Sequence, residues 1–126
     1  MATRALTYDR GITKDGAAFL AYWTNLTNAT SDVGAPLGFP AWGERTVQVF
    51  GTFGAGGNIV IEGSNDGANW VTLANRSGGS LSFNNAALSR IQDYPVYVRP
   101  RVTAGDGATN LSVYVVCHRF DINEHG

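Results

Sequence analysis

Short runs of alternating apolar and polar residues, separated by glycine-rich segments, fill most of this chain between residues 45 and 117. A period of two is typical of β-strands with one face in a core, because successive side chains point to opposite sides of a strand. Residues 54–57, 65–67, 78–79 and 105–107 supply turns. About eight strands at this spacing predict an all-β fold, an antiparallel β-sandwich of jelly-roll-like type. The positions expected to face the core include Val47, Val49, Phe53, Ile59, Ile61, Val71, Leu73, Val96, Val98, Val102, Leu111, Val113, Val115 and Cys117.

The composition agrees with one compact domain and excludes several functional classes. Hydrophobic residues make up 44% of the 126 residues and charged residues only 15%, which excludes a disordered tail and a coiled coil. The formal net charge is −1 and lysine occurs only at Lys14, which excludes a strongly basic nucleic-acid binder. We therefore expect no nucleic-acid partner.

The distribution of polar residues predicts one domain with an extended segment at each end. We expect an N-terminal arm at residues 1–16, a single β-sandwich domain at residues 17–117 and a C-terminal tail at residues 118–126. Residues 17–26 are apolar on both alternating faces, with Phe19, Ala21 and Trp23 opposite Leu20, Tyr22 and Leu26. Such a strand is either central to a sandwich or half covered by a partner, and periodicity also allows a short helix.

Two further features bear on the fold. Residues 31–44 contain two prolines, Phe39 and Trp42, and form an apolar loop that either folds over one end of the core or is functional. Pro100 lies on the inward register of its strand but has no N–H to donate, which favours an edge strand or a bulge.

The sequence lacks the usual signals of an enzyme, and we expect no catalytic residue, cofactor or metal. Both histidines, His118 and His125, lie in the last nine residues. Cys117 and His118 are adjacent, so on a strand they point to opposite faces and cannot act together as nucleophile and base. The Asp-Gly pairs at Asp66 and Asp106 fit turns better than calcium loops, because too few ligands accompany them.

The single cysteine excludes an internal disulfide. The N-terminal residues carry no apolar core of a secretory signal, and no apolar run reaches membrane-spanning length. We expect synthesis in the cytoplasm and no membrane partner.

Arginine and aromatic side chains suggest alternative binding roles. Tyr97, Arg99 and Arg101 point outward from one strand, and this row suits an acidic protein surface better than nucleic acid, although it also fits solvated strand arginines. Tryptophans Trp23, Trp42 and Trp70 could form a platform for sugars, whereas core or interface packing is the commoner role.

The segments VQVFGTFGAGGNIVIEGSNDGANWVTL and YPVYVRPRVTAGDGATNLSVYVV resemble the capsid decoration, or cement, proteins of tailed bacteriophages, over about residues 45–117. The shorter segment EGSNDGANW is similar to discoidin-like carbohydrate-binding modules, but the cysteine pair of many such modules is missing. The first resemblance implies a homo-oligomeric, dimeric or trimeric virion protein on the outer capsid surface. It would bind the major capsid protein and bridge neighbouring subunits. A tail or baseplate component and a carbohydrate-binding module are the alternatives.

From this reading we predict that the two terminal segments reach neighbouring chains or the capsid. The residues expected at protein interfaces are Arg4, Tyr8, Arg10, Phe39, Trp42, Tyr97, Arg99 and Arg101.

Overall fold

The computed structural model describes residues 2–9, 18–29, 31–38 and 42–119. Within these ranges the chain forms twelve strands and no helix. The strands are β1 (Thr3–Arg4), β2 (Thr7–Asp9), β3 (Ala18–Thr27), β4 (Val33–Gly34), β5 (Leu37–Gly38), β6 (Trp42–Thr52), β7 (Asn58–Ser64), β8 (Val71–Thr72), β9 (Ser82–Phe83), β10 (Ala87–Ile91), β11 (Tyr97–Ala104) and β12 (Asn110–Arg119).

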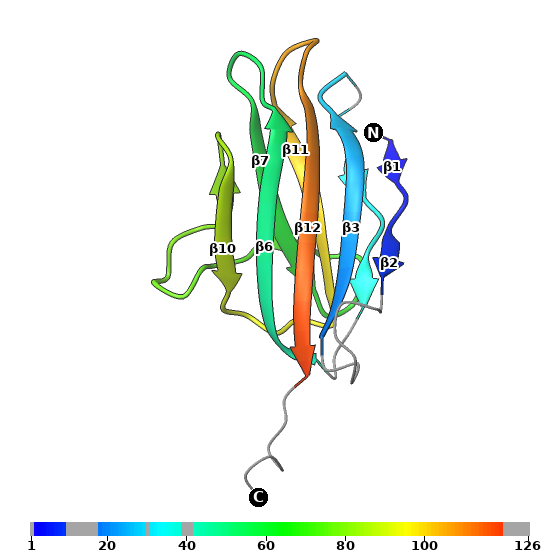
Figure 1. Cartoon of the computed structure of the whole chain (residues 1–126), viewed down its shortest axis with the longest axis vertical. Coiled ribbons are helices and arrows are strands. Elements are labelled where there is room, and N and C mark those ends of the chain that lie inside the picture. The colour runs from blue at the N-terminus through cyan, green and yellow to red at the C-terminus, as the bar shows by residue number, and fades with distance from the viewer. Residues whose placement is uncertain (1, 10–17, 30, 39–41, 120–126) are drawn as a thin grey trace, which may run out of the picture.

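The strands form two sheets that pack face to face, which confirms the predicted β-sandwich. The five-stranded sheet has the order β10-β6-β12-β3-β2. The seven-stranded sheet has the order β1-β4-β11-β7-β8, with β5 also beside β11 and β9 also beside β7. Figure 1 shows β6, β12 and β3 in front of β7 and β11. Neighbouring strands are antiparallel, except that β1 and β4 run parallel.

The core lies between the sheets and consists of the inward side chains of both. Strand β12 buries Leu111, Val113, Val115 and Cys117, as the alternation predicted. Along β6, Val47 and Val49 are likewise buried and pair in register with Val115 and Val113. The period-two pattern therefore identified the inward residues of β6 and β12 correctly, because one face of each strand is buried and the other is not. It failed at the short strand β8, where Val71 was expected to face the core but is 68% exposed.

The structure has twelve strands where about eight were expected. Five of them contain only two residues, and β2 contains three. A two-residue strand is too short to show an alternation of its own. Strands β2, β4, β5, β8 and β9 form because their backbone groups pair with longer strands, and β1 in turn pairs with β4. Such pairing between distant segments is a tertiary property.

Strand β3 resolves the ambiguity over residues 17–26 in favour of a strand, but Leu26 lies on the opposite face from the one expected. Trp23 pairs with Val113 and Leu26 pairs with Leu111, so two residues of β3 oppose one residue of β12. This is a β-bulge, and Asn25 in it has a positive φ of 58°. The extra residue shifts the alternation by one position and brings Leu26 into the core.

The described part of residues 31–44 folds over the core. Val33 in β4 and Leu37 in β5 are both buried, and each strand pairs with β11. Trp42 is the first residue of β6 and so belongs to a strand and not to a loop.

Pro100 lies in an interior strand, so the predicted edge position is wrong. Strand β11 has β7 on one side and β4 and β5 on the other. Val102 N donates to Asp32 O at 2.9 Å, so the nitrogen of Pro100, two residues earlier, faces the same side. The chain on that side is interrupted between β4 and β5, and a strand residue without an N–H is tolerated there. The register shift in β11 follows later, between Val102 and Ala104.

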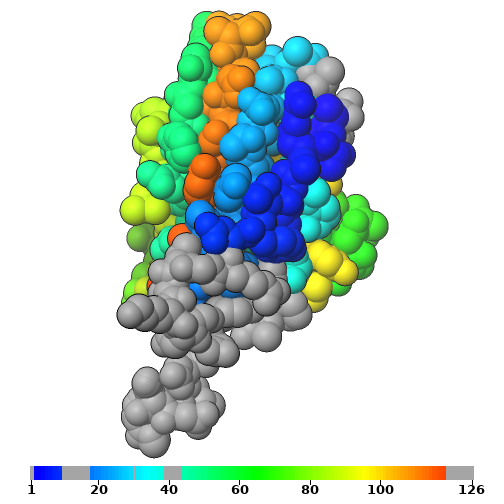
Figure 2. All heavy atoms as spheres, turned by 45° about the vertical axis from the view of Figure 1, so that its right-hand side comes forward, coloured from blue at the N-terminus to red at the C-terminus, as the bar shows by residue number. Residues whose placement is uncertain are grey.

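Residues 3–9 belong to the domain, contrary to the expectation of an arm over residues 1–16. Strand β1 pairs with β4 in the seven-stranded sheet, and β2 pairs with β3 in the five-stranded sheet. In Figure 2 this segment lies along the side of the sandwich, against β3. It thereby satisfies backbone groups at the edges of both sheets. Residues 10–16 lie outside the described residues.

At the other end, His118 and Arg119 complete β12, so the domain continues two residues beyond its predicted boundary. Residues 120–126 lie outside the described part of the chain.

Substitution of Gly34 by alanine should destabilise the fold by about 1–3 kcal/mol, as overpacking of a core does. A Cβ at Gly34 would lie 2.6 Å from both Pro100 Cδ and Trp23 Nε1. Urea denaturation measures the free energy of unfolding. Gly107→Ala is the matched control, because a Cβ there meets nothing within 4 Å. Equal stability of the two variants would contradict the packing argument.

Candidate interaction surfaces

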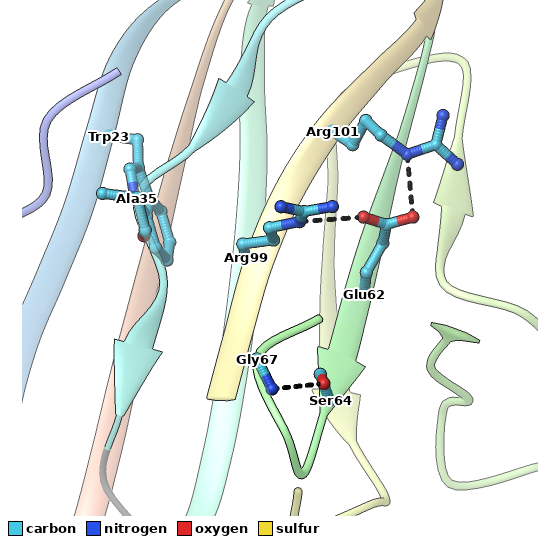
Figure 3. A network of polar contacts seen from close by, with 7 residues as sticks. All are labelled: Trp23, Ala35, Glu62, Ser64, Gly67, Arg99 and Arg101. Carbon is cyan, nitrogen blue, oxygen red and sulfur yellow. Dashed lines mark hydrogen bonds and ion pairs between the residues drawn. The ribbon is translucent and has the colours of Figure 1, made fainter. Parts of the chain in front are cut away.

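The outer face of the seven-stranded sheet carries a carboxylate that binds two arginines. Arg99 and Arg101 project from β11 on the face predicted for them, and Glu62 on β7 lies between them. Arg99 Nε is 3.1 Å from Glu62 Oε1, and Arg101 Nε is 2.7 Å from Oε2 (Figure 3). The Glu62 side chain is only 5% exposed, so its charge is compensated by two cations rather than by water. This cluster of Glu62, Arg99 and Arg101 is called the arginine face below.

Trp70 extends this surface. The guanidinium carbon of Arg99 lies 3.9 Å from the centre of a Trp70 ring, which is a close cation–π contact. One side of the indole is therefore covered by Arg99, which leaves less of it for stacking on a sugar. Trp23 is 1% exposed, and its Nε1 donates to Ala35 O at 2.9 Å, so this residue packs in the core.

The turn after β7 is close to the same surface. Ser64 Oγ accepts hydrogen bonds from Asp66 N and Gly67 N, and Gly67 has the positive φ that the Asn-Asp-Gly sequence predicted (Figure 3). The ring of Tyr97 lies against the backbone of Gly67, where a Cβ would be 3.6 Å from it. The turn therefore packs against the first residue of the row Tyr97, Arg99, Arg101.

Hydrogen bonds to Asp66 stabilise its ionised form. The carboxylate accepts from the backbone N–H groups of Asn69 and Ala68, from the Asn69 amide and from Ser64 Oγ. These bonds, the one from the Asn69 backbone first, hold the pKa of Asp66 well below its usual range. The pKa of Asp106 is also lowered, first by the N–H of Ala55 and then by that of Ala108. Both aspartates thus act as turn residues, as predicted.

Two of the other predicted contact residues, Arg4 and Tyr8, do not join the arginine face. Arg4 Nε forms an ion pair of 2.6 Å with Asp32 Oδ2, and the Asp32 side chain is completely buried. Asp32 also accepts from Thr27 N at 2.9 Å, so this pair ties β1 to the segment between β3 and β4. Tyr8 on β2 is 47% exposed and its ring lies 6.5 Å from that of Phe19. Arg10 and Phe39 lie outside the described residues.

A second surface, which the sequence analysis did not identify as a site, covers the outer face of the five-stranded sheet. Tyr22 and Tyr114 stack with ring centres 4.8 Å apart and an interplanar angle of 10°. Phe50 packs on Tyr114 at 5.2 Å, and Leu88 is 70% exposed. Cross-strand register places Tyr22, Tyr114, Gln48 and Leu88 in one row across four strands. We call this surface the aromatic face; it comprises Leu20, Tyr22, Gln48, Phe50, Leu88, Tyr114 and Val116.

The signal for the aromatic face was present in the sequence. Residues 17–26 are apolar on both faces, and Tyr114 and Val116 alternate with the buried residues of β12. Strands that are apolar on both sides either lie inside a protein or meet a partner. In the structure the second side of these strands is partly open to solvent: Gln48, Phe50 and Leu88 are exposed, and Leu20, Tyr22, Tyr114 and Val116 are half-buried.

Cys117 and His118 lie on opposite faces of β12. Cys117 is completely buried and free, and burial raises the pKa of its thiol to about 11, which fits the predicted role of a small apolar side chain. His118 is exposed. The described residues contain no group of three or more His, Cys, Asp or Glu arranged to hold a metal ion. No membrane-spanning helix occurs in the described ranges.

Comparison with known proteins identifies the fold but no family. No protein-family model and no curated protein matches the sequence. The structure is similar to that of the SPBc2 prophage-derived protein YomS, with a TM-score of 0.58 and 17% identity over 79% of this chain and 93% of that protein. The K1 cleaved adhesin domain of Lys-gingipain from Porphyromonas gingivalis W83 aligns with a TM-score of 0.44 and 12% identity over 93% of this chain and 85% of that domain. At these identities the similarity to YomS shows a shared fold, and the second alignment supports no argument.

The substitution Glu62→Gln should lower the free energy of unfolding by about 1–3 kcal/mol, because two arginines then lose their shared counter-charge. Guanidinium denaturation measures the effect. The matched control is Glu44→Gln, because Glu44 also pairs with an arginine, Arg90 at 2.9 Å, but its side chain is 50% exposed. We expect the control to change stability by about 0.5 kcal/mol or less. A control as destabilising as Glu62→Gln would show that burial of the pair is irrelevant.

Replacement of Asp66 by asparagine should make stability less sensitive to acid. Because the folded-state pKa of Asp66 lies below its unfolded value, its contribution is complete above the unfolded pKa of about 4 and is lost as the pH falls below it. Urea midpoints at neutral and acid pH measure the difference for each protein. We expect a smaller difference for Asp66→Asn than for the wild type. Identical differences would mean that the turn does not favour the ionised carboxylate.

Proposed function

We propose that this chain is a structural protein of a bacteriophage particle that binds the outer capsid surface and cements neighbouring capsid subunits. The fold is shared with a prophage-derived protein, and the sequence resembles phage decoration proteins over about residues 45–117. The observation that carries the proposal is the arginine face. It offers two ordered cations on a flat sheet surface, a geometry suited to acidic side chains of a large protein partner.

The arginine face is already ordered before any partner binds. Glu62 holds both arginines through Nε, and Figure 3 shows the terminal nitrogens of Arg101 pointing away from Glu62. Stacking on Trp70 restricts Arg99 further. Side chains that are ordered in advance lose less conformational entropy on binding. With two arginines and one glutamate, the cluster keeps one positive charge for a carboxylate of the major capsid protein.

Cementing then follows from mass action. A protein that binds only the assembled shell lowers the free energy of that shell and of no other state. Residues 3–9 pair with their own domain, so we assign capsid contact to the outer sheet surface rather than to this segment.

A density gradient of the native source lysate tests the proposal, with antibody detection of the chain in each fraction. We expect the chain to migrate with genome-filled particles in copy numbers that approach those of the major shell protein. Migration with isolated tails would instead indicate a tail or baseplate component. Recovery only as free protein at the top of the gradient would contradict any virion role, and glycan binding would then be measured.

Rebinding of purified protein to particles that lack it tests the arginine face directly. Arg101→Gln should reduce the bound fraction, and added salt should reduce binding of the wild type. Arg76→Gln is the control, because Arg76 is an exposed arginine outside the arginine face. Equal binding of both variants would contradict the assignment.

A further inference from the structure

We propose that the aromatic face is a homodimer interface, in which the five-stranded sheets of two copies pack against each other about a twofold axis. This assignment does not depend on where the protein is located, and it concerns the side of the sandwich opposite the arginine face. It is carried by the composition, size and charge of the aromatic face.

The composition is that of an interface core. Tyr114 contacts both Tyr22 and Phe50, with ring centres 4.8 Å and 5.2 Å away, so three aromatic rings form one contiguous cluster. Leu20 and Val116 pair across β3 and β12 next to this cluster. Aromatic side chains are enriched and charged ones depleted at the centres of protein interfaces. A contiguous apolar patch of this kind on a soluble domain marks an interaction site.

The size suits a stable dimer. Strands β3, β6 and β12 contain 10, 11 and 10 residues. At about 3.4 Å per residue and about 4.8 Å between strands, these three present roughly 500 Å² of flat sheet. The shorter strands β10 and β2 bring the whole to roughly 600 Å². Because the accessible area of projecting side chains exceeds the flat area, this agrees with the about 800 Å² that each partner buries in a standard interface.

The charge distribution favours a second copy of this chain as the binding partner of the aromatic face. In a twofold contact each surface meets itself, so a charge of one sign at the centre would oppose its own copy. The described outward residues near the middle of the sheet are uncharged: Leu20, Tyr22, Thr46, Gln48, Phe50, Ser112, Tyr114 and Val116. Charged groups lie at the margins: Asp9 is on the edge strand β2, Arg90 is on the edge strand β10, and Glu44 lies opposite His118 at one end of the central strands β6 and β12. An acidic or basic partner would find no counter-charge at the centre.

The strand order of the sheet indicates where the twofold axis of the dimer passes. Strand β12 is central in the order β10-β6-β12-β3-β2, and Tyr114 lies in the middle of β12. A twofold axis in the interface plane that passes over Tyr114 gives the greatest overlap of the two sheets. The sheets would then pack about 10 Å apart, as in the interior of a sandwich.

Sedimentation equilibrium of the purified chain tests the proposal. We expect the wild type to sediment at twice the mass of one chain and to dissociate on dilution. Gln48→Glu should raise the dimer dissociation constant by at least about tenfold, because it places an uncompensated negative charge from each copy in an uncharged contact without a change of shape. Higher salt should restore part of the affinity. Gln48 is exposed, so the variant removes no buried side chain.

The matched control is Val71→Glu, which adds the same charge at a position that is 68% exposed on β8 of the other sheet. It should dimerise like the wild type. A wild type that is monomeric at all concentrations, or trimeric, would overturn the proposal. A dimer dissociation constant that Gln48→Glu leaves unchanged would also overturn it. These results are independent of the lysate gradient, so failure of this proposal is distinguishable from failure of the virion role.

Discussion

Trp23 joins the two sheets, and several irregular features of the fold depend on how it packs. Its indole reaches from β3 in one sheet to the segment that contains β4 and β5 in the other, where its Nε1 donates to Ala35 O at 2.9 Å. Close contact requires a glycine at position 34, because a Cβ there would meet both Trp23 and Pro100. The same place interrupts the neighbouring strand, and Pro100 is thereby accommodated inside a sheet.

The buried carboxylates of Asp32 and Glu62 have different roles, one inside the domain and one at its surface. Asp32 is completely buried and pairs with Arg4, and so fixes the N-terminal segment to the domain. Glu62 pairs with Arg99 and Arg101 and orders a cationic surface. The opposite sheet presents an uncharged aromatic surface. A molecule with two chemically different faces can contact two different partners at once, and we propose that one face binds the capsid shell and the other a second copy of the chain.

The parts of the fold that could be predicted are those in which local pattern and burial agree. Val47, Val49, Val113 and Val115 are inward because long strands keep a strict period of two. The outward direction of Arg99 and Arg101 followed from the same rule. The bulge at Asn25 could not be foreseen, since one extra residue reverses the alternation after it and depends on pairing with β12. The pairing of residues 3–9 could not be foreseen either, because it depends on sheet edges formed by distant segments.

By itself, the sequence determined an all-β sandwich, the inward residues of β6 and β12 and the turns at Asp66 and Asp106, because these depend on residue type and on neighbours close along the chain. Only the tertiary structure decided which outward residues act together. Glu62 lies 37 residues from Arg99 along the chain yet forms an ion pair with it, and Tyr22 stacks on Tyr114 from another strand. Such clusters form across strands, where the register between distant segments sets the distances and no local pattern encodes it.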